Sequence, residues 1–202
     1  MTPTTLLSLL GIALVAGWTP GPNNALVATS GAQFGFWRTL PHVAGIGIGF
    51  PFMAFCISLG LGAVFQQSML IRESLRIIGI IVLLWFAWKV ATSGKPNSQS
   101  GKSRPFTFFE SAAFQWINPK GWIMAMSISS QFADPSKPII SSSIIAGVFF
   151  FVGFTSASGW TLFGKGMQRW LTTDRRANTF NWTMAALLLL SVLMIASSRL
   201  NT

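Results

Sequence analysis

The stretch Thr19-Pro20-Gly21-Pro22-Asn23-Asn24 lies inside a run from Met1 to Trp37 that carries no charged side chain. Two prolines and a glycine cannot continue an α-helical hydrogen-bond ladder, because each proline lacks an N–H and its ring clashes with the preceding turn. In an apolar run long enough to cross a bilayer, the freed backbone groups are tolerated only where protein or a water-filled cavity satisfies them. The stretch therefore predicts a broken transmembrane helix with a polar binding site at the break.

The composition is that of an integral membrane protein whose main partner is the lipid bilayer. Of the 202 residues, 51% are hydrophobic and only 9% are charged, against about 25% charged in an average soluble domain. The net charge of +10 comes from Lys and Arg scattered among apolar runs, so no basic face for nucleic acid is expected. Loops that face anionic lipid account for the positive charge better.

The chain lacks the residue types that catalysis and metal binding need. It has one His, one Cys and four carboxylates, with no CxxC pair and no arrangement of a nucleophile with a base. We therefore expect no enzyme activity, no catalytic residue, no cofactor and no metal site. Cys56 is expected to be a small buried hydrophobe, and His42, at a predicted helix entry, is expected at the membrane interface.

Apolar runs with few charges predict an all-α membrane protein with six transmembrane helices. The predicted helices cover about 1–37, 41–64, 69–92, 106–132, 139–164 and 177–198, and a polar turn is expected at 66–68. The fourth helix is interrupted at Asn118-Pro119-Lys120-Gly121. No Lys or Arg precedes the first apolar stretch and no small-residue cleavage site is evident, so a signal peptide is not expected.

We interpret residues 1–202 as a single transmembrane domain made of two halves. Residues 1–93 and 106–202 each hold three predicted helices, and residues 94–105 form a hydrophilic, cytoplasmic linker. Because three passes reverse the direction of entry, this is the arrangement of a 3+3 inverted repeat, with helices 1 and 4 broken. The breaks lie roughly 21 and 18 Å from the cytoplasmic ends at 1.5 Å per residue, near the middle of a core about 30 Å thick.

The paired breaks predict a substrate site at the bilayer midplane. Its expected binding residues are those of the two interruptions: Pro20, Gly21, Pro22, Asn23, Asn24, Asn118, Pro119 and Lys120. The N–H groups of the half-helix that begins after Pro22 suit a carboxylate, and carbonyls freed near 16–19 suit an ammonium. A lone proline break could be a structural kink, but a second break at a corresponding position favours a site.

Two ionisable residues of the fourth helix differ in their predicted depth. A lysine at the bilayer centre costs about 2.5–3.5 kcal/mol on insertion scales, so Lys120 is expected to face a cavity or a partner. Glu110 lies near the start of its helix, at the level of the headgroups.

Two glycine pairs, Gly31/Gly35 and Gly45/Gly49, have the small-xxx-small spacing that lets helices approach closely. Packing within one protomer is the favoured use of these pairs, and a seam in a homo-oligomer is the alternative.

With the two interruptions and the glycine spacing, the chain resembles the LysE/RhtB family of amino-acid exporters over nearly its whole length. The resemblance implies an exporter of amino acids or close derivatives in the cytoplasmic (inner) membrane, driven by proton or cation antiport. Many relatives carry Asp where this chain has Asn23, and the Asn-Asn form is similar to the cysteine/O-acetylserine exporter branch. Since Asn23 cannot exchange a proton, the coupling candidates are Lys120 and then Glu110.

Two other functions are compatible with the sequence. An uncoupled channel or facilitator for small zwitterions is favoured by the missing Asp. A membrane metal- or redox-handling protein with a similar helix count is disfavoured by the absence of CxxC and the shortage of ligands.

The distribution of Lys and Arg predicts the orientation. One side collects nine of them: Arg38, Lys89, Lys95, Lys102, Arg104, Lys165, Arg169, Arg175 and Arg176. The other side collects four: Arg72, Arg76, Lys137 and Arg199. The positive-inside rule places the first set in the cytoplasm and both termini outside.

Cysteine labelling checks this orientation. In a Cys56→Ala background, Ser98→Cys should react with a membrane-impermeant maleimide only in inverted vesicles, whereas Thr202→Cys should react in intact cells. Labelling of Ser98→Cys from outside intact cells would reverse the predicted topology and remove the depth argument for the site.

Overall fold

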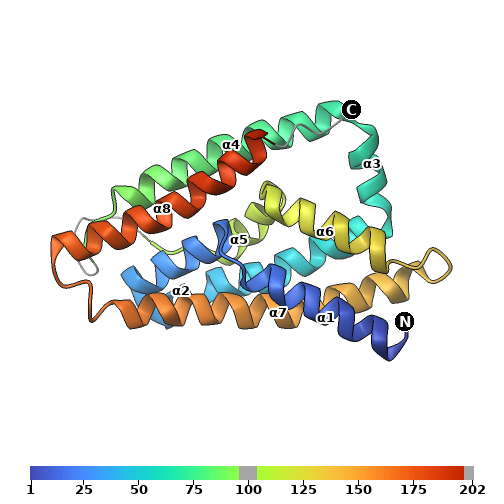
Figure 1. Cartoon of the computed structure of the whole chain (residues 1–202), viewed down its shortest axis with the longest axis horizontal. Helices are drawn as coiled ribbons and strands as arrows, with labels where there is room; N and C mark the ends of the chain where they lie inside the picture. Colours follow the sequence, from blue (N-terminus) through green and yellow to red (C-terminus); the bar gives the residue numbers. More distant parts are fainter. Residues whose placement is uncertain (96–103, 198–202) are drawn as a thin grey trace.

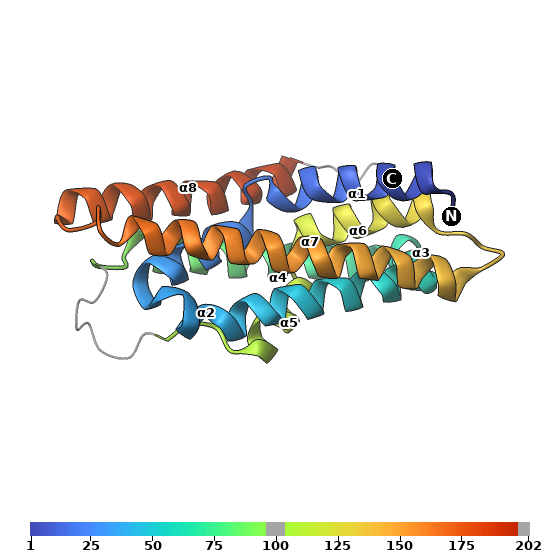
Figure 2. The same cartoon turned by 90° about the horizontal axis from the view of Figure 1, so that it is seen from below.

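The structure, a computed structural model, describes residues 1–95 and 104–197, and every regular element within them is helical. The elements are α1 (Pro3–Trp18), α2 (Pro22–Cys56), the π-helical η1 (Ile57–Leu61), α3 (Gly62–Gln67), α4 (Met69–Ala91), α5 (Phe108–Gln115), α6 (Pro119–Phe132), α7 (Pro138–Met167) and α8 (Asp174–Ser197). They run mainly along the long axis of the molecule, with α4 beside α8 and α7 along α2 (Figures 1 and 2). The predicted all-helical class is confirmed.

Four helical stretches of the described residues are long and apolar enough to cross a membrane. They are Pro22–Val64, Met69–Ala91, Pro138–Met167 and Asp174–Ser197. The last three match the predicted third, fifth and sixth helices within a few residues. Helices α1, α5 and α6 have 16, 8 and 14 residues, fewer than the about 20 that one span needs.

The first turn of the chain lies at Gly35, and the predicted second helix at 41–64 is wrong in its boundaries. Gly35 has φ 76° and ψ 175° inside α2, a conformation that glycine adopts without a steric penalty. The hydroxyls of Ser30 and Thr39 lie 2.9 Å apart, although nine residues of a continuous helix would separate them by roughly 13.5 Å. The chain therefore folds back at Gly35 (Figure 2). The prediction put the turn near Arg38 because Arg38 is the first charged residue in the sequence.

The far end of this segment also differs from the prediction. Helix α2 passes into η1, where Gly60 has φ 131°, and then into α3. The predicted polar turn at 66–68 shrinks to Ser68, because residues 66 and 67 are still helical. Ser68 caps α4 by accepting a hydrogen bond from the N–H of Ile71 at 3.3 Å.

Close contact between α2 and α7 depends on two glycines that face the partner helix's backbone. A Cβ on Gly31 would overlap the carbonyl oxygen of Thr161, and a Cβ on Gly164 would overlap that of Ala28. Each helix thus presents a glycine to a main-chain carbonyl of the other. Gly31 of the predicted Gly31/Gly35 pair thus serves packing within one chain.

The second glycine pair brings α5 against α2. A Cβ on Gly45 would lie 2.5 Å from the carbonyl oxygen of Phe108, and one on Gly49 would lie 2.6 Å from the Cα of Ala112. The pair therefore lets the first half of the broken α5–α6 segment lie on α2. Gly35, by contrast, has an open Cβ position and serves the turn.

His42 is buried, and its predicted interfacial position is wrong. The residue is 2% exposed, and its ring stacks on Phe106 with ring centroids 4.8 Å apart. The hydroxyl of Ser111 donates to the His42 carbonyl oxygen at 2.9 Å. Phe106 and Ser111, which contact His42, lie more than sixty positions away in the sequence, so its local neighbours could not indicate these contacts.

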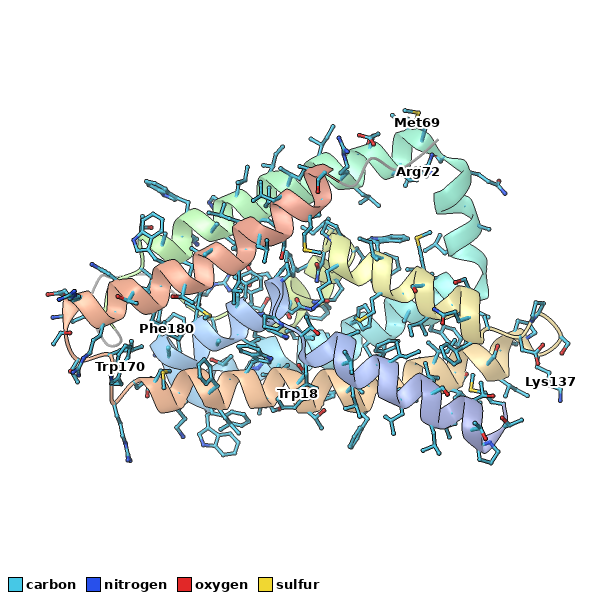
Figure 3. All side chains as sticks on the ribbon, viewed as in Figure 1. Trp18, Met69, Arg72, Lys137, Trp170 and Phe180 are labelled. Atoms are coloured by element: carbon cyan, nitrogen blue, oxygen red, sulfur yellow. The ribbon has the colours of Figure 1, made fainter. Side chains whose placement is uncertain are left out.

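The outer surface is rich in large apolar side chains. Leu70 on α4, Phe151 on α7 and Leu193 on α8 are 79%, 59% and 65% exposed, and side chains project outward along these helices (Figure 3). Contiguous apolar surface of this kind is rare on soluble monomers and fits contact with lipid. Lys137 and Arg72 lie toward one end of the long axis and Trp170 lies at the other (Figure 3).

The α2–α7 contact predicts a specific sensitivity to one added methyl group. Gly164→Ala should destabilise the protein by about 1–3 kcal/mol, because the methyl group meets the backbone of Ala28, which cannot rotate away. Gly147→Ala is the matched control on the same helix, since its Cβ position is open. The temperature at which purified protein loses its monodisperse gel-filtration peak should fall for Gly164→Ala only. Equal temperatures for the two variants would contradict the packing.

Candidate functional site

Both predicted helix interruptions are true breaks. Helix α1 ends at Trp18, Thr19 and Gly21 are extended, and α2 begins at Pro22. Helix α5 ends at Gln115 and α6 begins at Pro119, directly after the extended Asn118. The two breaks lie near the middle of the long axis (Figure 1).

The helices that follow the breaks begin in the same way. Each has proline at its first position and no side-chain hydrogen bond that caps it. The first N–H groups of such a helix have no partner within the helix and carry a partial positive charge. Residues at both helix starts line one cavity, and uncapped helix N-termini suit an anionic group.

A reciprocal amide pair joins the two breaks. The Nδ2 of Asn23 donates to Oε1 of Gln115 at 2.8 Å, and Nε2 of Gln115 donates back to Oδ1 of Asn23 at 3.3 Å. Gln115 is fully buried, and its Nε2 also donates to the carbonyl oxygen of Ser111 at 2.9 Å. The side chain of Asn23 is thus oriented by the last residue of α5.

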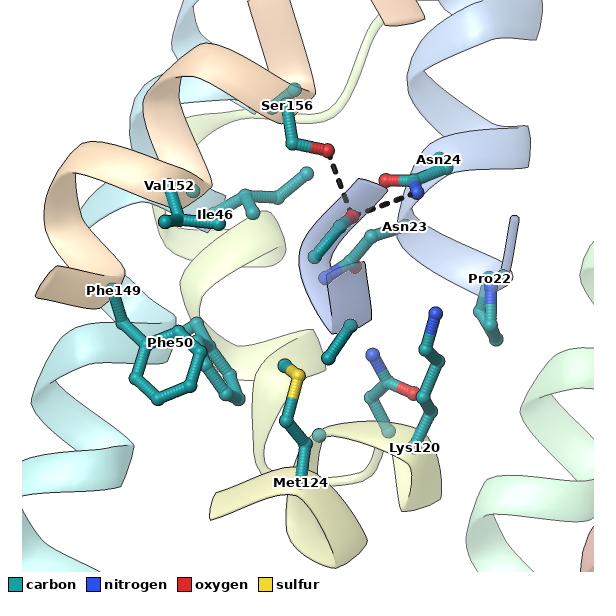
Figure 4. A pocket seen from close by; sticks show the side chains of 17 residues that line it. Pro22, Asn23, Asn24, Ile46, Phe50, Lys120, Met124, Phe149, Val152 and Ser156 are labelled. Carbon is teal, nitrogen blue, oxygen red and sulfur yellow. Dashed lines mark hydrogen bonds between the residues drawn. The ribbon is translucent and has the colours of Figure 1, made fainter. Parts of the chain in front are cut away.

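The carbonyls that the first break frees are satisfied by side chains. Nδ2 of Asn24 donates to the carbonyl oxygens of Gly17 and Thr19, at 3.1 and 2.9 Å. The hydroxyl of Ser156 on α7 donates to Gly17 at 2.8 Å (Figure 4). Asn24 therefore binds back onto the end of α1 and does not cap α2.

Lys120 connects the start of α6 to the end of α1. Its Nζ donates to the carbonyl oxygen of Thr19 at 2.8 Å. The side chain passes over Gly21, where a Cβ would lie 2.9 Å from Cδ and 3.0 Å from Nζ of Lys120. The glycine of the Pro-Gly-Pro sequence thus leaves room for the lysine.

A cavity of about 50 Å³ lies between the breaks, enough for a few water molecules. Both breaks contribute to its wall, as do α1, α2, α6 and α7: Ala16, Gly17, Gly21, Pro22, Asn23, Asn24, Ile46, Phe50, Asn118, Lys120, Gly121, Met124, Phe149, Val152, Gly153, Ser156 and Ala157. Asn118 is 3% exposed, and its Oδ1 accepts no hydrogen bond from the described residues. A buried acceptor of this kind is available to a ligand's N–H group.

The cavity has a polar side and an apolar side. Lys120 and Asn24 lie on one side, and Phe50, Phe149 and Val152 lie on the other (Figure 4). The rings of Phe50 and Phe149 meet edge to face with centroids 5.0 Å apart. A small molecule with a charged end and an uncharged side chain fits this division.

Six of the eight residues expected in the site line the cavity: Gly21, Pro22, Asn23, Asn24, Asn118 and Lys120. Pro20 and Pro119 are not among the lining residues; Pro20 is exposed, and the ring of Pro119 faces Gly79 of α4. The prolines at 20 and 119 thus shape the breaks without lining the space between them.

Glu110 lies away from the cavity, at the entry of α5. Its carboxylate accepts two hydrogen bonds from the guanidinium of Arg104, at 2.6 and 2.5 Å, and one from the N–H of Thr107 at 2.9 Å. Thr107 and Glu110 also complete a capping box at this helix start. Its predicted position near the helix entry is confirmed.

Two polar residues of the site, Gln115 and Ser156, are absent from the sequence prediction. Gln115 stands between Phe114 and Trp116, and a polar side chain in such an apolar run was the available signal. Ser156 shares α7 with other Ser and Thr residues whose hydroxyls bond to their own helix, such as Thr155 and Thr161, so its sequence context does not distinguish it.

These features define a class: a helical membrane protein with a small two-sided cavity where two broken helices meet. Residues 14–198 match the model of the family described as LysE type translocator. The match covers most of the chain, and the protein belongs to this family of membrane translocators. The predicted resemblance is confirmed.

The chain is also similar to bacterial proteins named cysteine/O-acetylserine efflux protein. The relative from Klebsiella pneumoniae subsp. pneumoniae is 33% identical over 195 residues, which cover 93% of this chain and 95% of that protein. Those from Escherichia coli O157:H7 and Escherichia coli strain K12 are 31% and 30% identical over 176 residues, covering 84% of this chain and 87% of each relative. No solved structure matches the chain significantly.

The amide pair between the breaks predicts an energetic coupling. Asn23→Ala and Gln115→Ala should each destabilise the protein, and the double variant should lose less than the sum, with a coupling of about 0.5–3 kcal/mol. Gln131→Ala is the control, because its Nε2 bonds only to Ser127 on its own exposed helix face. Thermal unfolding in one detergent would measure all four variants. Additive losses at positions 23 and 115 would contradict the pairing.

Proposed function

We propose that this protein exports small neutral amino acids or their close derivatives across the cytoplasmic membrane by proton or cation antiport. The family and the efflux proteins that resemble the chain support export of amino-acid-like solutes. The observation that carries the proposal is the cavity between the two helix breaks, because it offers partners for both charges of a zwitterion.

The carboxylate of a zwitterion has cationic and N–H partners in the cavity. The ammonium of Lys120 and the uncapped N-termini of α2 and α6 supply positive charge. The amino group has acceptors: the free Oδ1 of Asn118 and the carbonyls of Gly17 and Thr19. Half-helix ends bind substrates in this manner in transporters with broken helices.

The cavity favours a substrate whose side chain is uncharged. Its apolar wall suits a short side chain, and all four carboxylates of the chain are engaged elsewhere: Glu73 with Arg76, Glu110 with Arg104, Asp174 with Lys95, and Asp134 with Ser136. A cationic side chain would therefore lack a counter-charge. Cysteine and O-acetylserine, named in the relatives, belong to the neutral class that fits.

The proposed exporter is one transmembrane domain of six passes, with both termini outside. Helix α1 and the part of α2 before Gly35 form the first pass, and α5 with α6 forms the fourth. Each of these passes contains one break. Residues 1–93 and 106–202 would then be the two halves of an inverted repeat, joined at 94–105, with the site at their interface.

Lys120 is the coupling residue that we propose, with H⁺ as the coupling ion. It lines the cavity, whereas Glu110 is held by Arg104 at the helix entry. A lysine in a poorly solvated cavity holds its proton less firmly than one beside a bound carboxylate does. Lys120 can therefore be an ammonium in one of the two transport states, inward- or outward-facing, and release the proton in the other. An uncoupled facilitator is the second candidate, supported by Asn23 in the place where many relatives carry Asp.

Transport from preloaded liposomes tests the function. Purified protein should release a neutral amino acid from a panel of neutral, acidic and basic ones, and should move it against its gradient when a pH gradient is imposed. Lys120→Met should abolish the pH-driven part, and Asn23→Asp should keep or increase the pH dependence. Glu110→Gln should have a milder effect.

The matched control is Lys89→Met, because Lys89 stacks on Trp85 at the end of α4, outside the cavity. This variant should transport like the wild type. Uphill transport by Lys120→Met that still follows the pH gradient would exclude Lys120 as the coupling group. Transport by the wild type only down the substrate gradient would favour the facilitator, and no release of any amino acid would contradict the proposal.

A further inference from the structure

The ammonium of Lys120 occupies the position in which a substrate's amino group is expected to bind. The break after Trp18 frees the carbonyl oxygen of Thr19, and freed carbonyls near this point are the natural acceptors for an ammonium. In the structure this oxygen accepts hydrogen bonds from Nζ of Lys120 at 2.8 Å and from Asn24 at 2.9 Å. The protein thus fills the site with an ammonium of its own.

The lysine has no carboxylate partner that would hold it elsewhere. The four acidic side chains of the sequence are bound to other groups, as described above. Among the described residues, the ammonium of Lys120 donates to a neutral carbonyl, that of Thr19. A carboxylate brought in by a ligand is a stronger partner for an ammonium than a carbonyl is.

The size of the cavity points the same way. At about 50 Å³ it is well below the about 300–1,000 Å³ of typical small-molecule pockets. The lysine side chain forms part of its wall and passes close over Gly21. A shift of this side chain would both enlarge the space and free the Thr19 carbonyl.

We infer that Lys120 is a tethered ammonium that occupies the Thr19 carbonyl while the site is empty and is displaced when a zwitterion binds. The ligand's carboxylate draws Nζ away from Thr19, and the ligand's amino group takes over the carbonyl that Nζ leaves. Lys120 therefore recognises the carboxylate and competes with the amino group. This inference rests on the proposed function, since it assigns a role in the same site.

A lysine that competes with the ligand's amino group can be told apart from one that only binds its carboxylate. Removing Lys120 should strengthen the binding of a ligand that has only an amino group, because the Thr19 carbonyl becomes free. It should weaken the binding of a ligand that has only a carboxylate. Only ligands with both groups gain from the wild-type arrangement, which would make the site selective for zwitterions over simple amines.

The test measures binding of propylammonium and of propionate to purified, detergent-solubilised protein by isothermal titration. The dissociation constant of propylammonium should be at least about tenfold lower for Lys120→Met than for the wild type. This ratio corresponds to the free energy of one charge-assisted hydrogen bond. Lys120→Met should bind propionate more weakly by a similar factor. Lys120→Arg, which keeps a cation on the same helix, should bind propylammonium as weakly as the wild type. Unchanged or weaker propylammonium binding by Lys120→Met would overturn the inference.

A second variant leaves the lysine in place and moves it. Gly21→Ala puts a methyl group against Cδ and Nζ of Lys120 and should displace the ammonium from Thr19. It should therefore also bind propylammonium more tightly than the wild type, whereas Gly11→Ala, whose Cβ position on α1 is open, should not differ from it. If Lys120→Met does not purify as a folded protein, Gly21→Ala and Lys120→Gln decide the matter by the same measurement.

Binding of the two probes is independent of transport, so the two proposals fail separately. Tighter propylammonium binding by Lys120→Met together with no amino-acid release by the wild type would support the tethered ammonium and contradict export. Amino-acid release by the wild type with equal propylammonium affinities in both proteins would support export and overturn the tethered ammonium.

Discussion

The constraint on which this structure depends is the satisfaction of backbone groups where two helices break at the centre of an apolar protein. Within a bilayer these groups must be satisfied by the protein itself or by a water-filled cavity. At the first break, Asn24, Ser156 and Lys120 donate to the carbonyls of Gly17 and Thr19. These donors come from α2, α7 and α6, so one local interruption fixes the relative positions of three other helices. A polar ligand could replace each of these donors. The place where the protein satisfies the freed carbonyls is therefore also a potential binding site.

The structure also depends on close packing of the helices that surround the breaks. Glycines at 31 and 164 bring α2 and α7 to backbone contact, and glycines at 45 and 49 bring α5 onto α2. Without a hydrophobic driving force between helices in lipid, such contact supplies the van der Waals and polar interactions that hold a bundle together. It also places Gln115, the last residue of α5, beside Asn23. The geometry of the site therefore depends on small residues that never touch the cavity.

The sequence was sufficient to predict the helical class, both breaks and six of the seventeen residues that line the cavity, because proline and uncharged runs act locally. Three features needed the folded chain. The prediction put the turn at Arg38 and not at Gly35. A backbone conformation with positive φ does not alter the hydropathy pattern, whereas the charge of Arg38 does. The burial of His42 depends on Phe106, which reaches it from a distant segment. Gln115 became part of the site only through its pairing with Asn23, and neither residue alone specifies its partner.

The amide of Asn23 fits this pairing in a way that a carboxylate would not. An aspartate at position 23 would accept from Nε2 of Gln115, as Asn23 does now, but its second oxygen would face Oε1 at the place of the present 2.8 Å hydrogen bond. Two acceptors in contact repel each other, and turning the glutamine over would only move the repulsion to the other carboxylate oxygen while taking Nε2 away from Ser111. The amide at position 23 and the amide at position 115 thus fit each other as a set. With a neutral pair at its centre, the site keeps one ionisable side chain among its lining residues, that of Lys120. Any charge–charge interaction or proton exchange in the cavity therefore involves that lysine and the charged groups of the ligand.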